Sequence, residues 1–375
     1  MGAVGEAVAV YVHSPFCLSK CGYCDFSSYA MRGEIVERTV EATIAEIGRT
    51  PWRGRPAKTV FFGGGTPTFL SERQLLGILE TVLEAHPPLS GAEISSEANP
   101  GTADAAKFAA MRAAGFNRLS IGAQSFCDND LKTLGRVHSS SEIGESVDVA
   151  RRAGFQNINL DLMFALPGQS LEAWITNCRS AVELETEHLS LYCLTIEPST
   201  PFHRLYISGQ LQQPDEESQV TMYDACVDTL AEVGVAQYEI SNFARRGREC
   251  GHNLCYWRGE EYVAYGPGAV GAVATAAGPR VRYTNLKLPS AYCEAMEAGG
   301  ELWEEREELD ESIQRTERIM LGIRLNEGID GERERLNGEA VGRLEASGLV
   351  ERDGARVRLT RRGRHYCTDV AAELI

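Results

Sequence analysis

The sequence predicts an α/β fold in which a parallel sheet is followed by a small C-terminal α+β domain. Apolar strand patterns alternate with helical patterns in six successive units before residue 201, and such alternation is typical of a parallel sheet. After residue 308 the order becomes helix, helix, strand, strand and helix, which is a winged-helix-like order with Asp353-Gly354 as the turn between the strands. A chain of 375 residues is long enough for two or three domains.

Each strand–helix unit has its own signals in the sequence. Strand patterns open the stretches 7–14, 58–70, 92–100, 117–126, 157–169 and 188–201. Helical spacing of apolar residues follows at 34–48, 71–86, 102–115, 139–154 and 171–185. Ser71 is a predicted N-cap, and Gly115 and Gly154 are predicted to end two of the helices. A polar stretch from residue 201 predicts a linker before a further helix at 215–234.

Three thiols follow the first predicted strand. Cys17, Cys21 and Cys24 have CxxxCxxC spacing, which is close enough for them to converge on one metal centre. A closed zinc site and a [4Fe-4S] cluster each take four ligands, but Phe26 stands where a CxxxCxxCxC run would place the next Cys. Three thiolates on a four-iron cube leave one iron open for an exchangeable ligand. The alternative is three unrelated buried cysteines.

This cysteine pattern resembles the radical S-adenosylmethionine (SAM) superfamily. The stretches GGGTPTFL, EANP, GAQSF and DLMFALPGQ resemble its oxygen-independent coproporphyrinogen III oxidase family. The resemblance implies a partial (β/α)6 radical SAM barrel in which the open iron of the [4Fe-4S] cluster binds SAM. Matching the motifs residue by residue implies that this SAM contacts Tyr11, Gly64, Glu97, Gln124, Arg136 and Asp161. A second SAM is expected to contact Tyr23, Gly65 and Thr66.

The positions of these side chains support a single site. In α/β barrels the functional residues lie at the C-terminal ends of strands, and Glu97, Gln124 and Asp161 lie at or close to such ends. Carboxylates suit the cationic groups of SAM, and Arg136 suits its carboxylate as a bidentate partner. Taken singly, each strand-end residue could instead be a helix cap or a loop hydrogen bond, and Arg136 could be a surface arginine.

A second informative stretch is HNLCYW at residues 252–257. An imidazole beside an aromatic pair suits a flat macrocycle, because imidazole is a common axial ligand of heme iron. The arginines Arg245, Arg246 and Arg248 precede it and could meet propionates. The alternative is a hydrogen-bonded structural histidine packed among aromatic residues. The stretch resembles the HNxxYW motif of the heme chaperone HemW subgroup of this family, and this resemblance implies that His252 binds heme.

The resemblance also sets out domains and function. We expect a radical SAM partial barrel over 1–245, an HNxxYW-containing extension and connector over 246–308, and a winged-helix-like domain over 309–375. The implied function is that of a heme chaperone, which binds heme, the cluster and SAM and transfers heme to acceptor proteins. The alternatives are an oxygen-independent coproporphyrinogen III dehydrogenase and a radical SAM C-methyltransferase with two SAM sites. Whether the protein is an enzyme therefore stays open, although Phe26 and the short segment before Tyr11 favour the carrier.

Composition limits the partners and the compartment. A net charge of −16 argues against a nucleic-acid partner, despite the arginine-rich predicted wing. No apolar run is long enough for a membrane span, and the N-terminus lacks a signal pattern, so we expect a cytoplasmic protein. In that compartment clustered cysteines indicate a metal or redox site rather than disulfides, and we expect most of the eight cysteines outside the loop to be small core residues. Further expected partners are a reductase or ferredoxin-type electron donor and, in a possible homodimer, a second copy of the chain.

Overall fold

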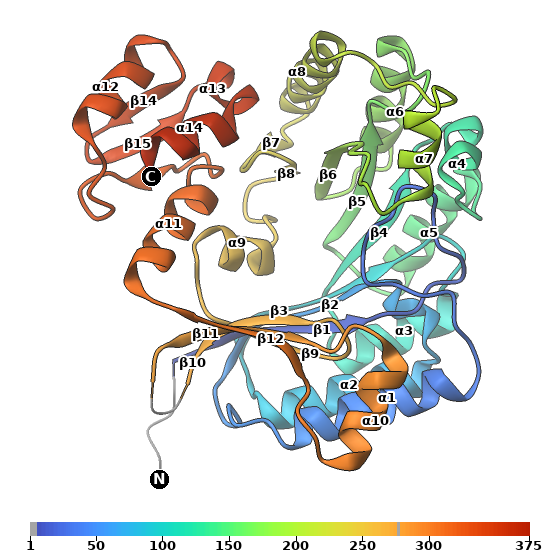
Figure 1. Cartoon of the computed structure of the whole chain (residues 1–375). Helices are drawn as coiled ribbons and strands as arrows, with labels where there is room; N and C mark the ends of the chain where they lie inside the picture. The colour runs from blue at the N-terminus through green and yellow to red at the C-terminus, as the bar shows by residue number, and fades with distance from the viewer. Residues whose placement is uncertain (1–5, 276–277) are drawn as a thin grey trace.

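The computed structural model describes residues 6–275 and 278–375, and within them twelve strands form one large sheet (Figure 1). The strand order is β12-β11-β10-β9-β1-β2-β3-β4-β5-β6-β8-β7. All pairings from β1 to β6 are parallel. The predicted α/β fold is therefore confirmed, and the six parallel strands form an open, partial barrel.

The parallel strands and five of the helices between them follow the predicted order, whereas the helix over Asp128–Leu134 was not predicted. The strands are β1 (Val8–Ser14), β2 (Ala57–Gly64), β3 (Pro88–Ala98), β4 (Arg118–Gln124), β5 (Ile158–Phe164) and β6 (His188–Cys193). The helices are α1 (Glu34–Gly48), α2 (Glu72–Ala85), α3 (Ala105–Ala114), α4 (Asp128–Leu134), α5 (Ser140–Arg152) and α6 (Leu171–Glu183), with the short 3-10 helix η1 (Pro67–Phe69) after β2. As predicted, Ser71 caps α2, here in a capping box with Gln74, and Gly115 ends α3 in the left-handed conformation.

The two faces of the parallel sheet differ in chemistry. In β5, the side chains of Ile158, Leu160 and Leu162 are fully buried in the main hydrophobic core. The alternate residues Asn159 and Asp161 line a cavity on the other face. Because side chains alternate across a strand, one apolar face binds the helices, and the polar face is left for the lumen of the partial barrel.

The remaining strands extend both edges of the parallel core. β9 (Tyr262–Tyr265) pairs parallel with β1, and β10 (Val270–Ala274), β11 (Arg280–Asn285) and β12 (Trp303–Leu309) continue antiparallel from it. At the other edge β8 (Asn242–Ala244) pairs with β6, and β7 (Ala236–Gln237) pairs with β8. The stretch 246–308 thus adds strands to the sheet of the barrel. It also carries helices α9 (Gly251–Trp257) and α10 (Pro289–Ala298).

Residues that the sequence assigns to a linker form helix α7 (Pro201–Ile207), which precedes α8 (Glu216–Glu232). Thr200 caps α7 by accepting a hydrogen bond from the His203 N–H at 3.3 Å, and Pro201 occupies the first turn. Phe202 of this helix is buried and makes an edge contact with Tyr23, their ring centroids lying 6.2 Å apart. Tertiary packing against the cysteine loop therefore stabilises a helix whose polar flanks predict a loop.

The C-terminal residues have a core of their own. They form α11 (Glu311–Gly322), β13 (Ile329–Asp330), α12 (Gly338–Ala346), β14 (Val350–Asp353), β15 (Arg356–Leu359), α13 (Arg361–His365) and α14 (Cys367–Leu374). The order confirms the winged-helix-like prediction, and β13 adds a third strand to the wing. Arg361 after the wing pairs with Asp228 of α8 at 2.7 Å, so this arginine faces its own chain. Within the part of the chain described, no helix is long and apolar enough to cross a bilayer.

Candidate functional site

The three cysteines of the loop after β1 line one cavity of about 420 Å³. Cys17, Cys21 and Cys24 are all half-buried, and none of the three forms a disulfide. The Gly22 N–H donates to the Leu134 carbonyl at 3.4 Å, and a Cβ on Gly22 would lie 2.7 Å from the Phe202 ring. Glycine is therefore required between the second and third thiols, because α4 and α7 hold the loop closely from outside.

The surroundings of the thiols affect thiolate formation in two opposite directions. Burial raises the pKa of Cys17 and of Cys24, so bound metal would have to displace their protons. A guanidinium nitrogen of Arg136 lies 3.7 Å from the Cys21 sulfur, where it can stabilise negative charge. Among the described residues no three His, Cys, Asp or Glu side chains are grouped as the ligands of a single metal ion. The donor set itself, three half-buried thiols around one cavity, fits a [4Fe-4S] cluster with one open iron.

The structure brings most of the predicted SAM residues to this same cavity. Those that line it together with the cysteines are Tyr23, Gly64, Gly65, Thr66, Glu97, Gln124, Arg136 and Asp161. Backbone conformation and close packing explain why glycine occupies positions 64 and 65. Gly64 has a φ of 107°, and a Cβ on Gly65 would lie 2.6 Å from the Phe16 carbonyl oxygen. The backbone of β2 can therefore approach both the cysteine loop and whatever fills the cavity.

Two carboxyl groups lie at the inner side of the cavity. Burial, and then the neighbouring Asp161, raise the pKa of Glu97 to about 8, although the Gly64 N–H donates to it at 3.1 Å. Burial also raises the pKa of Asp161, against hydrogen bonds from Asn159 at 2.9 Å and Ser120 at 3.0 Å. Buried carboxyls of this kind suit a ligand that brings hydroxyl groups or positive charge.

Asn99 is a site residue that sequence reasoning missed. Its amide nitrogen donates to the Thr66 hydroxyl at 2.7 Å, and its carbonyl oxygen accepts from Arg136. Arg136 also donates to the Gly122 carbonyl at 2.8 Å, so its guanidinium is held in one orientation. Asn99 belongs to the EANP stretch, which was noted as a motif, but nothing in the sequence indicated its hydrogen-bond partners.

Tyr11 is the predicted SAM residue that does not line the cysteine cavity. Its hydroxyl lies 3.0 Å from Nδ1 of His13, and the residue lines a second cavity of about 290 Å³ in the lumen. That lumen cavity shares Glu97, Ser120, Asp161 and Tyr192 with the cysteine cavity. At its wall lies Arg118, which is 2% exposed and whose Nε has no hydrogen-bond partner among the described residues.

His252 lies in the wall of the lumen cavity, behind Tyr256. The side chain is 1% exposed, and both ring nitrogens are engaged, Nδ1 with the Thr59 hydroxyl and Nε2 with the Tyr256 hydroxyl, each at 2.9 Å. Its ring stacks on Phe61 with centroids 5.1 Å apart, and burial followed by Arg118 lowers its pKa to about 3. The structure therefore keeps this histidine neutral and hydrogen-bonded inside the protein.

Glu93 of β3 explains why α9 begins where it does. Its carboxylate accepts hydrogen bonds from the Gly251 N–H at 2.9 Å and the His252 N–H at 3.2 Å, and a negative charge at a helix N-terminus is favourable. The two cysteines beside the motif are buried. Cys250 points its thiol at Glu93 from 3.5 Å, and Cys255 points its thiol at the Gly251 carbonyl from 3.2 Å.

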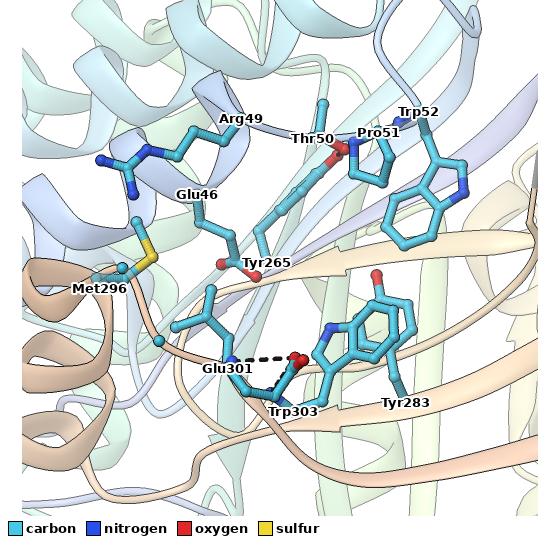
Figure 2. Close-up of a pocket in the computed structure, with 13 residues that line it drawn as sticks. Glu46, Arg49, Thr50, Pro51, Trp52, Tyr265, Tyr283, Met296, Glu301 and Trp303 are labelled. Atoms are coloured by element: carbon cyan, nitrogen blue, oxygen red, sulfur yellow. Dashed lines mark hydrogen bonds between the residues drawn. The ribbon is translucent and has the colours of Figure 1, made fainter.

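A further cavity of about 320 Å³ contains none of the predicted residues (Figure 2). Tyr283 stacks between Trp52 and Trp303, with ring centroids 5.5 Å and 4.8 Å away. Glu46 lines the same cavity, and its carboxylate accepts from the Tyr292 hydroxyl at 2.5 Å, the Gly266 N–H at 2.8 Å and Asn285 at 2.7 Å. Sequence reasoning missed this cavity because its lining residues come from α1, β11, α10 and β12, which are far apart in the sequence.

Comparisons with known proteins agree with the geometry. Residues 11–179 match the model of the Radical SAM superfamily, and residues 309–366 match the HemN C-terminal domain. The chain is 38% identical over 328 residues to the heme chaperone HemW of Bacillus subtilis (strain 168), covering 87% of this chain and 85% of that one. It is 35% identical over 380 residues to the heme chaperone HemW of Mycobacterium tuberculosis (strain ATCC 25618 / H37Rv), covering 99% and 95%.

A solved structure resembles the whole fold. Coproporphyrinogen III oxidase (HemN) from Escherichia coli, a radical SAM enzyme, superposes with a TM-score of 0.83 over 98% of this chain and 90% of that chain. The sequence identity is 22%, so this similarity concerns the fold alone.

Proposed function

Since the chain belongs to the heme chaperone HemW family of radical SAM proteins, we propose that it binds heme and passes it to acceptor proteins. The observation that carries this proposal is the match to HemW of Mycobacterium tuberculosis, which spans 95% of that protein at 35% identity. The HNLCYW stretch at 252–257 supports it, because it places a histidine and two aromatic residues on one short helix. The chemistry of heme carriage is binding and release, so it requires no catalytic residue.

The cysteine cavity would hold the cluster and SAM. Cys17, Cys21 and Cys24 would ligate three irons, and the reduced cluster would supply an electron to the sulfonium of SAM. Arg136, already oriented by Asn99 and the Gly122 carbonyl, would bind a carboxylate. Gly64 and Gly65 would let the backbone approach the ligand. Tyr11 would act from the lumen side, where its ring borders the same carboxyl groups.

Tyr23, Gly65 and Thr66 are proposed to contact a second SAM. All three line the cysteine cavity, and Tyr23 is held there by its contact with Phe202. The lumen cavity of about 290 Å³ adjoins the cysteine cavity through Glu97, Ser120, Asp161 and Tyr192. The proposed electron donor is a reductase or a ferredoxin-type protein, the proposed compartment is the cytoplasm, and a homodimer is the proposed assembly.

His252 is proposed to contribute to heme binding through Tyr256. Its Nε2 is occupied by the Tyr256 hydroxyl, so an approaching iron would meet the phenol before the imidazole. A phenolate is a known protein ligand of heme iron, and the hydrogen bond to His252 would orient the phenol. Because burial raises the pKa of Tyr256, the iron would have to displace the phenol proton. In this arrangement the histidine acts as a positioning residue.

Anaerobic heme titration tests the proposal. The full chain, with its cluster reconstituted, should bind about one heme with a Soret band, and His252→Ala should shift that band or weaken the affinity. The cluster should remain in the variant, because the histidine does not line the cysteine cavity. The absence of heme binding by the unaltered chain would refute the proposed function. Sustained conversion of coproporphyrinogen III to protoporphyrinogen with SAM would instead establish the dehydrogenase.

A further inference from the structure

The outer side of the cysteine loop packs against the end of α4 and the start of α7. The Gly22 N–H donates to the Leu134 carbonyl at 3.4 Å, and the Gly22 carbonyl accepts from the Phe202 N–H at 3.0 Å. A Cβ on Gly135 would lie 4.0 Å from the Cα of Cys21. Figure 1 shows both helices on the opposite side of the barrel from the C-terminal residues. The main chain around Gly22 therefore connects the thiols directly to these two helices.

Exposed apolar side chains concentrate on this side of the molecule. Within the described residues fourteen large apolar side chains are exposed, and six of them belong to the cysteine loop, the segment after α4 and helix α7. These six are Leu18, Phe26, Val137, Leu205, Tyr206 and Ile207. Phe26 is 64% exposed and Ile207 is 67% exposed, so neither is covered by its own chain. Single exposed apolar residues are normal, but a concentration of this kind marks an interaction surface.

These apolar side chains lie on one continuous surface. Phe26 lines the cysteine cavity, and Leu205 lines a neighbouring hollow of about 500 Å³ together with Thr133 of α4. Phe202 borders that hollow, and its ring contacts Tyr23, which lines the cysteine cavity. The hollow and the mouth of the cysteine cavity are therefore neighbours. This surface, the cluster face, comprises residues 15–33, 131–139 and 198–211.

The cluster face carries positive charge on an acidic protein. It contains five lysines and arginines and one aspartate, whereas the whole chain has 37 basic and 53 acidic residues. Among the described residues, the exposed Arg32, Lys132 and Arg204 form no ion pair. Their charges are therefore available to a partner, and complementary charge guides encounter and fixes orientation. An acidic protein matches this face, whereas a second copy in an isologous dimer would meet it with like charge.

Acidic side chains border the cluster face, but each has another place or partner. Asp130 of α4 accepts from the Ser125 hydroxyl, and Asp128 accepts from the Ser140 N–H, each at 2.7 Å. Both belong to the beginning of α4, whereas Lys132 belongs to its last turn. Glu197 lines the cysteine cavity itself. The unpaired positive charges on the outer surface are therefore not neutralised by these neighbours.

We propose that the cluster face is the docking surface of an acidic electron-donor protein, a small low-potential ferredoxin. The inference rests on the proposed function and deepens it by giving the electron donor a place on the chain. Electron transfer slows steeply with distance, so a donor must approach the surface next to the thiols. The donor would lose one electron and the cluster would gain it, with no bond formed or broken. No residue that lines the lumen cavity belongs to the cluster face, so donor docking leaves that cavity uncovered.

The test measures the binding of an oxidised, acidic plant-type ferredoxin to the full, cluster-reconstituted chain by anaerobic calorimetry. Binding should weaken at high ionic strength, because salt screens exposed charges. Lys132→Glu and Arg204→Glu should each weaken binding by about fivefold, since each replaces an attraction by a repulsion, and Ile207→Ser by about threefold. The matched controls are Arg352→Glu and Leu89→Ser, which alter exposed side chains outside the cluster face and should bind normally. A basic cytochrome c should not bind.

The outcomes separate the docking surface from the function, because hemin is titrated into the same preparations. If the unaltered chain binds hemin but no ferredoxin, or if the cluster-face variants bind ferredoxin as tightly as the controls, the docking surface is refuted and heme carriage stands. If it binds ferredoxin but no hemin, the proposed function is refuted instead. Loss of self-association in Ile207→Ser, with ferredoxin binding unchanged, would assign the face to a second copy. Should Ile207→Ser fail to fold, as shown by circular dichroism, the two charge reversals decide.

Discussion

The carboxyl group of Glu46 should make the stability of the barrel depend on pH in an unusual direction. Burial raises its pKa from 4.5 to about 7, even though hydrogen bonds from Tyr292, Gly266 and Asn285 oppose the shift. The folded protein therefore binds this proton more tightly than the unfolded chain does. Its contribution to stability is complete below pH 4.5 and is lost as the pH rises toward 7, which is the reverse of an ion-paired carboxylate.

The size of the effect follows from the two pKa values. The gap between 4.5 and about 7, at roughly 1.4 kcal/mol for each pH unit, amounts to about 3.5 kcal/mol in full. The side chain is half-buried and borders the cavity in Figure 2, so water partly screens it. We therefore expect a loss of about 2 kcal/mol in the free energy of unfolding between pH 5 and pH 8.

Glu46→Gln should abolish this part of the pH dependence. Urea unfolding at pH 5 and pH 8 can be followed by tryptophan fluorescence, because Trp52 and Trp303 line the same cavity. The matched control is Glu301→Gln, which removes an exposed carboxylate from the rim of that cavity. The reasoning is refuted if Glu46→Gln keeps the full pH dependence of the unaltered chain. It is also refuted if the unaltered chain gains stability relative to Glu46→Gln as the pH rises.

Two further predictions concern the cysteine cavity. Cys17→Ala, Cys21→Ala and Cys24→Ala should each lose bound iron on reconstitution, whereas Cys127→Ala, outside the cavity, should keep it. Bound iron can be measured by a colorimetric assay. Equal iron in all four variants would contradict the assignment of the three cysteines as cluster ligands. Gly65→Ala should lower the free energy of unfolding by about 1–3 kcal/mol and reduce iron content, because its Cβ would lie 2.6 Å from the Phe16 carbonyl oxygen. Gly338→Ala, where a Cβ would meet no atom within 4 Å, is the control, and equal losses in both variants would show that the contact does not matter.

The sequence by itself determined the order of the elements and most of one site. Strand and helix periodicities are local properties, so they predicted β1 to β6 and the helices α1, α2, α3, α5 and α6, but not α4 or α7. A parallel sheet brings the C-terminal strand ends to one edge, and Glu97, Gln124 and Asp161 do line the cavity of the cysteines. The CxxxCxxC spacing needed no tertiary information, because its residues are neighbours along the chain.

Only the tertiary structure decided which side chains of distant segments meet. Tyr11 belongs to a predicted strand, but its side chain borders the lumen and not the cysteines. His252 was visible as a motif residue, yet its two hydrogen bonds depend on Thr59 of β2 and on the phenol one helical turn away. The stack of Trp52, Tyr283 and Trp303 gave no sequence signal at all. Burial, hydrogen-bond pairing and charge compensation depend on contacts across the fold, which local spacing does not encode.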